Sequence, residues 1–408
     1  MRLLKVDTID QARKKLWEKV KNKSPDNEMV SLEDVHNRIL AEDIYVSCDI
    51  PGFRRATVDG YALFAADTAA AGDAIPVFLK QTGSVLMGKP AECSIRAGEC
   101  VNVPTGGMLP DGADAVAMVE YCESAGGNIA VYEAVAPGMG VAEAGEDIRS
   151  GELLLRKGAR IRHQETGLLA AAGITEIPVF SLPKITIIST GDELVPPEQN
   201  PAPGEIRDIN THVLKNLALK RGYSVVSVQL LPDDSERLEA AITEAMTFSD
   251  VIVISGGSSQ GEKDLTAAVI NQTAKPGVFT HGLALKPGKP TILGWDEESQ
   301  TLLAGLPGHP VSAMMVFELI IGWLYDELFN VAPPLLVPAK ISTNLPGSPG
   351  KTLCQPVILK LEGTQYSAEP VFGKSGMITT LTKANGYIIL DLNKEGLAKG
   401  EAVLVNLF

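Results

Sequence analysis

Residues 251–259 read Val251-Ile252-Val253-Ile254-Ser255-Gly256-Gly257-Ser258-Ser259, an apolar run that opens into a glycine loop. Four consecutive β-branched residues predict a buried strand. Glycine lets a backbone approach a ligand closely, and free N–H groups in such a loop suit a phosphate. We therefore expect a phosphate-binding loop at the end of a buried strand. Its binding residues would be Ser255, Gly256, Gly257 and Ser258, and an ordinary tight turn is the alternative.

Strands and helices of similar length alternate around this stretch. The expected strands are Lys184–Ser189 and Ser224–Leu230, and the expected helices are Asn210–Arg221 and Glu236–Thr247. This alternation predicts a doubly wound α/β domain, which we assign to residues 182–331. Ligands on such sheets bind beyond the carboxyl ends of the strands. Both the glycine loop and Thr190-Gly191-Asp192-Glu193 should lie at that edge.

A turn with two lysines follows, Lys286-Pro287-Gly288-Lys289-Pro290. The chain has 36 Lys and Arg against 50 Asp and Glu, a formal net charge of −14. That balance argues against non-specific binding to nucleic acid or to an anionic membrane surface. On so acidic a chain, two lysines locked between prolines favour an anion-binding turn over a merely solubilising one.

Cysteine usage and hydrophobicity indicate the compartment. The five cysteines form no Cys-x-x-Cys pair and their number is odd. A disulfide framework or a zinc site is therefore not expected, and reduced thiols fit the cytoplasm. The first ten residues lack the apolar core of a signal peptide. The longest apolar helix candidate, Val311–Leu328, carries three acidic residues and is not expected to span a membrane.

The remaining chain predicts three further domains. Residues 47–143 hold short β-type runs punctuated by Gly and Pro, which predicts a β-rich domain inserted into a mixed, elongated linker and dimerisation domain of residues 1–46 and 144–181. Pro333-Pro334 and Pro338 mark a linker. After it, residues 332–408 read as a small C-terminal β-barrel domain.

Two helix starts are expected in the first of these domains. Thr8 is the expected N-cap of a helix over Thr8–Lys21, in which apolar residues recur at helical spacing. Ser31-Leu32-Glu33-Asp34 resembles a capping box with Asp in place of Glu. It predicts a second helix that continues to Leu40.

Carboxylates that could serve a cation stand near the expected ligand edge. Glu193 follows a strand, although its neighbour Asp192 could be the member that faces a ligand. Asp233 is ambiguous, because Asp234 or Ser235 could equally cap the next helix. Asp264 comes a few residues after the glycine loop. Mg²⁺ prefers a few carboxylates together with phosphate oxygens and water, so such a set suits it.

The order of the motifs carries a resemblance over nearly the whole chain. It runs through Arg38–Asp43, Val58–Ala62, Thr105-Gly106, Gly145–Ile148, Ser189–Leu194, Ser255–Asp264, Lys286–Pro290 and Gly305–Ala313. With these motifs in this order, the chain resembles the MoeA/gephyrin-E family, the molybdopterin molybdenumtransferases. No G-x-G-x-x-G follows the first strand of the α/β domain, which disfavours a dinucleotide-binding fold.

The resemblance implies a reaction and an assembly. Family members insert molybdate into adenylylated molybdopterin, use Mg²⁺ and release AMP. They form elongated homodimers, with the site in a cleft between the α/β domain of one subunit and the β-rich domain of the other. Transient contacts with the adenylyltransferase and with acceptor molybdoenzymes are implied too.

The resemblance also implies roles for particular residues. The catalytic carboxylates would be Asp59, Glu193, Asp233 and Asp264, of which Asp59, Glu193 and Asp264 would ligate the metal. Substrate would be bound by Thr105, Asp147, Lys286, Lys289 and Ser375, in addition to the glycine loop. From the residues alone, Asp59 could as well form an Asx turn with Gly60, Thr105 a turn hydroxyl, and Asp147 a surface ion pair with Arg149.

Some positions depart from the family pattern. Arg54 and Ala56 stand where Asp and Ser are usual, and His309 stands where Asn is most common. Lys351 and Gln355 replace arginines, and Gly282 replaces a lysine of some members. Arg54 would add a cation that draws in molybdate. These departures leave open whether the oxoanion substrate is molybdate or tungstate.

Two other function classes also remain. One is a non-catalytic scaffold that binds molybdopterin. The other is an adenylyl-transfer variant of the same pathway, whose enzyme shares the α/β domain but lacks the extra domains seen here.

Overall fold

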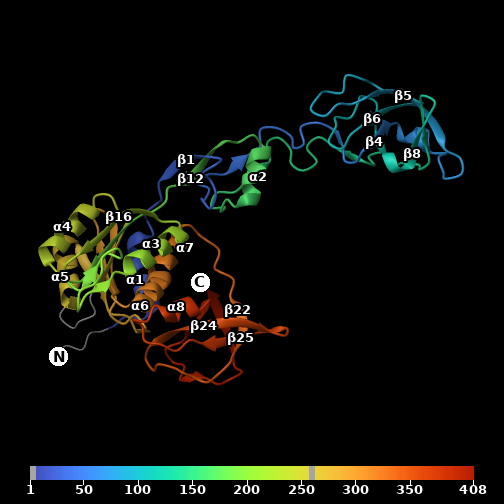
Figure 1. The fold of residues 1–408 in the computed structure, drawn as a ribbon. Helices are drawn as coiled ribbons and strands as arrows, with labels where there is room; N and C mark the ends of the chain where they lie inside the picture. The colour runs from blue at the N-terminus through green and yellow to red at the C-terminus, as the bar shows by residue number, and fades with distance from the viewer. Residues whose placement is uncertain (1–5, 257–261) are drawn as a thin grey trace. The chain divides into compact units, whose positions relative to one another are not determined.

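The computed structural model describes residues 6–256 and 262–408 of the chain. They form two compact units. The main unit comprises Met1–Glu28 and Phe180–Phe408, and the inserted unit is Met29–Val179 (Figure 1). The predicted division into four domains is finer than this, and its boundaries stay predictions.

Helix α1 (Ile9–Val20) begins the main unit. The Thr8 hydroxyl accepts a hydrogen bond from the Gln11 N–H at 3.2 Å, and the Gln11 side chain accepts one from the Thr8 N–H at 3.0 Å. This reciprocal cap satisfies two of the donors that a helix start leaves open. The buried face consists of Ile9, Ala12, Leu16 and Val20, so the predicted helix, its cap and its apolar stripe are confirmed.

A six-stranded sheet forms the centre of the main unit, in the order β16-β13-β17-β21-β20-β18. The bounds are β13 (Lys184–Thr190), β16 (Ser224–Leu231), β17 (Val251–Gly256), β18 (Pro276–His281), β20 (Ile292–Asp296) and β21 (Thr301–Pro307). The first four strands of this order are mutually parallel. Strand β20 runs antiparallel to both of its neighbours, so β18 has the same direction as the first four. Because Thr190 pairs with Gly256 and Gly256 with Pro307, the carboxyl ends of three central strands meet at one edge.

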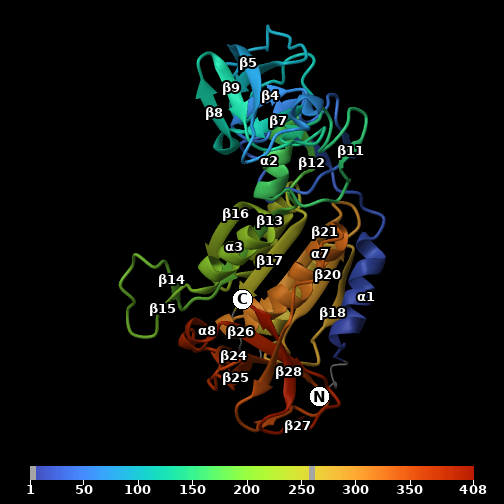
Figure 2. The same ribbon diagram turned by 90° about the vertical axis from the view of Figure 1, so that its right-hand side faces the viewer.

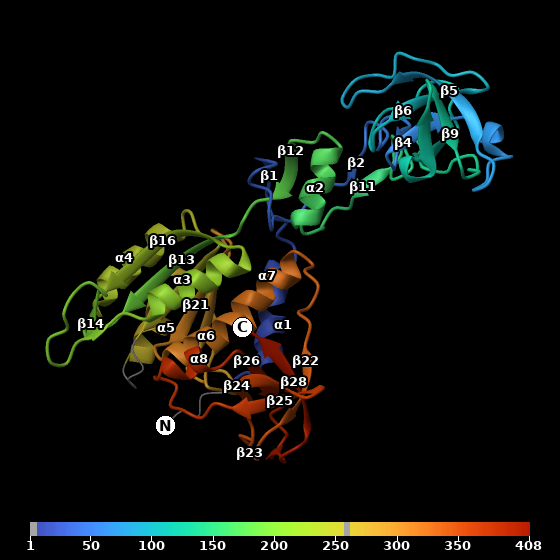
Figure 3. The same ribbon diagram turned by 45° about the vertical axis from the view of Figure 1, so that its right-hand side comes forward.

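Helices cover both faces of this sheet. Helices α3 (Asn210–Arg221), α6 (Pro310–Val316) and α7 (Trp323–Leu328) lie over one face, with a π-helical stretch, Phe317–Gly322, between the last two (Figure 2, Figure 3). Helices α4 (Ser235–Ala245) and α5 (Glu262–Thr273) share a core cluster with Ile188, Ile252 and Ile254. The alternate residue Val253 is equally buried, as expected for a strand covered on both faces. A short parallel pair, β14 (Leu194–Val195) and β15 (Ile206–Arg207), lies after β13.

A small closed β-barrel ends the chain. Its strands are β22 (Val337–Ile341), β24 (Thr352–Glu362), β25 (Gln365–Pro370), β26 (Gly386–Leu390) and β28 (Ala402–Leu407), and β24 pairs with β26 to close it. Strand β19 (Leu285–Lys286) leaves the sheet region and pairs with β24. The lysine turn is therefore joined directly to the barrel. Minor elements are β23 (Leu345–Pro346), β27 (Gly396–Leu397) and α8 (Thr379–Lys383).

The inserted unit contains a second six-stranded sheet, in the order β7-β4-β6-β5-β9-β8. The bounds are β4 (Gly60–Leu63), β5 (Val77–Ser84), β6 (Glu99–Val103), β7 (Ala115–Met118), β8 (Cys122–Ala125) and β9 (Asn128–Val131), with 3-10 turns Ala65–Thr68 and Val119–Tyr121. A separate apolar core lies beneath α2 (His163–Ala171). The short pairs beside it are β1 (Asn27–Ser31) with β12 (Glu176–Phe180) and β2 (Ile44–Tyr45) with β11 (Leu153–Leu155). A third pair, β3 (Arg55–Ala56) with β10 (Val141–Ala142), packs in the core of the six-stranded sheet.

The fold class is confirmed: a doubly wound α/β domain, a β-rich insertion and a small terminal barrel. Within the described residues, none of the helices has the length and apolar character needed to cross a bilayer.

Two local predictions are wrong. No helix follows Ser31, where β1 ends in turns and Asn37 adopts a φ of 64°. The backbone N–H of Leu32 donates instead to the Thr175 carbonyl at 2.9 Å, a tertiary contact that competes with helix formation. Pro338 does not lie in a linker but in β22, where it pairs with Leu404.

Candidate active site

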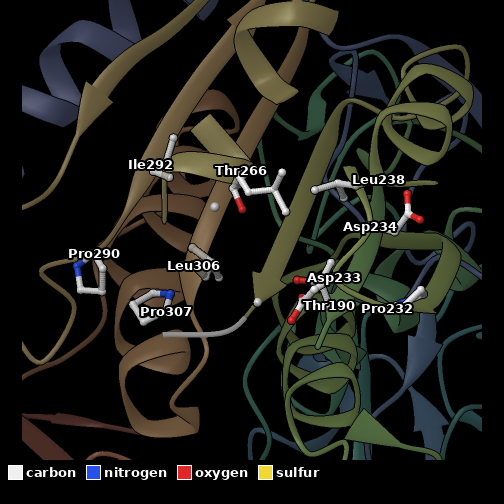
Figure 4. Close-up of a pocket in the computed structure, with 13 residues that line it drawn as sticks. Thr190, Pro232, Asp233, Asp234, Leu238, Thr266, Pro290, Ile292, Leu306 and Pro307 are labelled. Atoms are coloured by element: carbon white, nitrogen blue, oxygen red, sulfur yellow. The ribbon is translucent and has the colours of Figure 1, made fainter. Parts of the chain in front are cut away.

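A narrow depression lies at the carboxyl edge of the main sheet. Its walls come from the ends of several strands, with Thr190 and Asp233 on one side and Pro290 and Pro307 on the other (Figure 4). This is the edge at which doubly wound sheets bind their ligands. The depression therefore lies at the edge of the sheet where the sequence predicts ligand binding.

Two loops at this edge are tied to each other by carboxylates. The Asp233 N–H donates to Asp192 Oδ1 at 3.1 Å, and the Asp192 N–H lies 3.4 Å from Asp233 Oδ2. Asp234 caps α4, because its Oδ1 accepts from the N–H groups of Glu236 and Arg237 at 2.9 and 3.0 Å. Of the alternatives for that cap, Asp234 takes the role and Asp233 lines the depression.

The other predicted carboxylates of this edge are Glu193 and Asp264. Glu193 is half-buried, and its Oε2 lies 2.7 Å from where a Cβ would stand on Gly191, so the carboxylate folds back over the end of β13. The backbone of Asp264 belongs to α5, but its side chain lies outside what the structure describes. Gly257 and Ser258 also lie outside the described residues.

The end of β17 is tightly packed. Ser255 is 1% exposed, and its hydroxyl accepts a hydrogen bond from the Asn210 side chain at 2.8 Å. A Cβ on Gly256 would stand 2.2 Å from Thr190 Oγ1, so only glycine fits beside that hydroxyl. The contacts of Ser255 with Asn210 and of Gly256 with Thr190 thus fix the end of β17 at this edge of the sheet.

Lys286 and Lys289 present their ammonium groups to solvent from a fixed turn. The Lys289 carbonyl accepts from the Leu283 and Thr291 N–H groups at 2.9 and 3.0 Å, and the Thr291 hydroxyl donates to the Gly288 carbonyl at 2.7 Å. Within residues 6–256 and 262–408, neither lysine has an ion-pair partner. Two exposed lysines therefore stand in one rigid turn.

Ser375, the predicted site residue of the barrel, meets the turn at the start of α6. Its hydroxyl lies 2.9 Å from His309 Nδ1, and the Val311 N–H donates to the Ser375 carbonyl at 3.2 Å. The barrel therefore reaches the carboxyl edge of the sheet through this loop as well as through β19.

Asp59 and Thr105 come together in the inserted unit. Both the backbone N–H and the hydroxyl of Thr105 donate to Asp59 Oδ1, at 2.6 and 2.8 Å. These two bonds, the backbone one first, hold the pKa of Asp59 below its ordinary value. Asp147 lies in another loop of the same unit and is exposed, with its N–H donated to the Ile50 carbonyl at 3.1 Å.

Models of three protein regions match consecutive parts of this chain. The MoeA N-terminal region (domain I and II) matches residues 7–173, a probable molybdopterin binding domain matches residues 186–326, and the MoeA C-terminal region (domain IV) matches residues 338–408. The chain belongs to the MoeA family.

Relatives and a solved structure of the family match nearly all of this chain. A putative molybdopterin biosynthesis protein of Methanocaldococcus jannaschii is 32% identical, with both chains covered to 100%. A protein of Haemophilus influenzae named molybdopterin molybdenumtransferase is 31% identical, with 98% of each chain covered. A crystal structure of the molybdopterin biosynthesis MoeA protein of Pyrococcus horikoshii superposes with a TM-score of 0.81 at 38% identity, covering 99% of both chains.

The departures from the MoeA pattern have structural explanations in two cases. Arg54 does not offer a free cation to molybdate, because its Nε pairs with Glu143 at 2.9 Å and its Nη1 donates to the Ala113 carbonyl at 3.0 Å. Gly282 has a φ of +98°, and a Cβ there would stand 2.9 Å from Val6 Cγ1. A lysine at that position would be strained, since side chains rarely adopt this backbone conformation.

Two further departures, Lys351 and Gln355, lie in the barrel. The Gln355 side chain donates to the Val371 carbonyl at 2.7 Å and to the Pro356 carbonyl at 3.1 Å, so it is engaged inside the domain. Lys351 is half-buried, and nothing in the structure explains its replacement of an arginine.

The donor set fits Mg²⁺ in part. Among the described residues, no three His, Cys, Asp or Glu side chains gather closely enough to hold a metal ion alone. Glu193 and Asp233 nevertheless supply carboxylate oxygens at the edge where the loops of β13 and β16 are tied together. Mg²⁺ is commonly held by one or two carboxylates, with water and substrate phosphates completing its octahedron. The residues present fit a cation that a phosphate-bearing substrate helps to bind.

Two residues of this region were not foreseen in their roles. Asn210 was expected only as the first residue of a helix, and His309 only as a departure, not as the partner of Ser375. The polar residues Asp208, Asn210 and Thr211 at a helix start are the one sequence signal that points to Asn210.

Proposed function

We propose that this protein inserts molybdate into adenylylated molybdopterin with release of AMP, in an Mg²⁺-dependent reaction of molybdenum cofactor biosynthesis. The observation that carries the proposal is the full-length similarity to relatives named molybdopterin molybdenumtransferase. The lysine turn supports it too, because its two lysines have no ion-pair partner among the described residues and lie at a sheet edge lined by carboxylates. That combination suits a phosphate ligand and a cation.

Phosphate binding is assigned to the end of β17 with its glycine loop, Ser255 to Ser258, and to Lys286 and Lys289. The two ammonium groups would offset the charge of the ligand on a chain whose net charge is −14. Molybdate, a dianion, would enter the same positive field. Molybdenum gains bonds to the two dithiolene sulfurs while one oxygen leaves molybdate as water with the two thiol protons, and a water molecule cleaves the pyrophosphate bond to release AMP. No cysteine is therefore required as a nucleophile.

Cation binding is assigned to Glu193 and Asp264, together with Asp59 of another subunit, and Asp233 is assigned to the catalytic carboxylates. When bound, Mg²⁺ supplies polarisation of the pyrophosphate and stabilises charge on the departing AMP. Thr105 keeps Asp59 in its charged form through two hydrogen bonds. Asp147 and Ser375 complete the proposed set of residues that bind substrate.

Assembly and location complete the proposal. In the family, Asp59 of one subunit faces the α/β domain of the other, so we assign the active form to a homodimer. Its partners would be the adenylyltransferase that makes its substrate and the molybdoenzymes that accept its product. A cytoplasmic location fits five free cysteines.

AMP release from purified adenylylated molybdopterin tests this function. With molybdate and Mg²⁺ present, we expect multiple turnovers, and omission of either should abolish them. Asp59→Asn should lower the rate by at least about 100-fold if its charge is used in the reaction. Tight pterin binding without AMP release under all conditions would indicate a scaffold instead.

A further inference from the structure

Asn210 occupies a buried position below the ligand edge. It is the first residue of α3 and only 9% exposed. Its Nδ2 donates two hydrogen bonds, to Ser255 Oγ at 2.8 Å and to the Gly308 carbonyl at 2.6 Å. Ser255 lies near the end of β17 and Gly308 directly follows β21. One side chain therefore joins the ends of two neighbouring strands at the edge where the ligand is proposed to bind.

The orientation of this amide is fixed by its partners. A carbonyl oxygen can only accept, so Nδ2 and not Oδ1 must face Gly308. Among the described residues, Oδ1 is consequently left buried without a hydrogen-bond partner. Buried polar atoms without partners are rare in native proteins and destabilise them. Stability alone therefore does not explain an asparagine here, whereas the bridge between the two strand ends does.

The turn that Asn210 holds is also held from its other side. Residue His309, next to Gly308, contacts Ser375 of the barrel at 2.9 Å. The turn between β21 and α6 is thus fixed between α3 and the barrel. Since Lys286 and Lys289 belong to a turn whose strand β19 pairs with the same barrel, the cations and the strand ends share one framework.

We infer that Asn210 is a positioning residue of the proposed reaction. Its side-chain amide holds the end of β17 and the turn after β21 in the relative geometry that the bound phosphate and pterin require. This inference rests on the proposed function. Misplacement of reacting groups by about 1 Å can lower a rate by roughly 100-fold, so losing the bridge should affect turnover more than folding.

The test compares two neighbouring buried residues. Asn210→Ala removes both bonds of the bridge. Thr211→Val removes a buried bond of similar kind, between Thr211 Oγ1 and Ser189 Oγ at 2.9 Å, but leaves the bridge intact. We expect kcat for AMP release to fall about 10- to 100-fold in Asn210→Ala and less than about threefold in Thr211→Val. The two variants should lose similar amounts in melting temperature.

Equal losses of kcat in the two variants would overturn the inference. If Asn210→Ala does not fold, Ser255→Ala takes its place, because it removes one of the two hydrogen bonds of Asn210. We expect it to lower kcat by about 3- to 10-fold. An unchanged kcat would contradict the bridge. The wild-type rate tests the proposed function separately. If the wild type binds molybdopterin without turnover, the dissociation constant for molybdopterin replaces kcat. Binding should then be weakened by the same factors in the two variants.

Discussion

Ser375 Oγ lies 2.9 Å from His309 Nδ1, which joins a loop of the C-terminal barrel to the turn that follows β21. The Val311 N–H adds a second bond, to the Ser375 carbonyl. Together with the pairing of β19 and β24, these contacts attach the barrel to the ligand edge of the sheet at two places. The barrel is therefore part of the framework of the proposed site.

Ser375→Ala should weaken this attachment. The hydroxyl bond contributes about 1 kcal/mol, so we expect a small decrease in melting temperature and a rate of AMP release lowered about 3- to 10-fold. His309→Asn, which restores the usual family residue, should stay within about threefold of wild type because an amide can also bond to Ser375. Thr382→Ala is the control, since that hydroxyl bonds only within α8. A larger loss in the control than in Ser375→Ala would refute this role.

Thr105→Val should change the pH dependence of the reaction. Removing the hydroxyl takes away one of the two hydrogen bonds that lower the pKa of Asp59, while the larger one, from the backbone, remains. The pKa of Asp59 should rise, so the acidic limb of the kcat/KM profile should move to higher pH. Steady-state kinetics across the acidic range measure the shift. If the acidic limb does not move, the group whose protonation controls kcat/KM is not Asp59.

Gly256→Ala should destabilise the protein through one identifiable clash. The new Cβ would meet Thr190 Oγ1 at 2.2 Å, and overpacking of this kind costs about 1–3 kcal/mol. Thr190→Ala removes the clashing oxygen, so the double variant should be more stable than the sum of the two single effects predicts. Urea unfolding of all four proteins gives the coupling energy. If the changes in the free energy of unfolding are strictly additive, the clash with Thr190 is not the cause of the destabilisation.

The ion pair between Glu165 and Arg162 should make the stability of the inserted unit depend on pH in the acidic range. The Arg162 side chain bonds to its carboxylate at 2.7 and 3.1 Å and lowers its pKa from 4.5 to about 2. Because the folded-state pKa is depressed, the stabilisation is fully present above pH 4.5 and is lost as the pH falls towards about 2. Glu165→Gln should melt lower than wild type above pH 4.5, and the difference should shrink on acidification. A constant difference would contradict the assignment.

Sequence periodicity predicted the main elements well where local signals agreed. Helix α3 has the predicted bounds, and it ends before Gly222, whose φ of 96° stops the helix. The helix after Ser31 failed because a capping motif is local, while Leu32 bonds to Thr175, a distant partner. The reversed strand β20 of the main sheet was not predicted either, since periodicity does not reveal strand direction.

The site was predicted as a collection of residues more than as an arrangement. The pairing of Asp59 with Thr105 follows from register, because Gly60 pairs with Val103 across β4 and β6. Asn210 could not be predicted as a bridge, since its partners lie 45 and 98 residues away along the chain. Arg54 illustrates the opposite error, because a charge counted in a sequence can already be paired in the fold.

Subunit complementation tests the central claim most directly. Asp59→Asn and Lys286→Ala chains, each expected to be nearly inactive in AMP release, would be co-expressed and purified together. If each site combines Asp59 of one subunit with Lys286 of the other, a mixed dimer contains one intact site, and statistical pairing should restore about a quarter of the wild-type rate. A rate no higher than that of the separate variants would contradict a site shared between subunits.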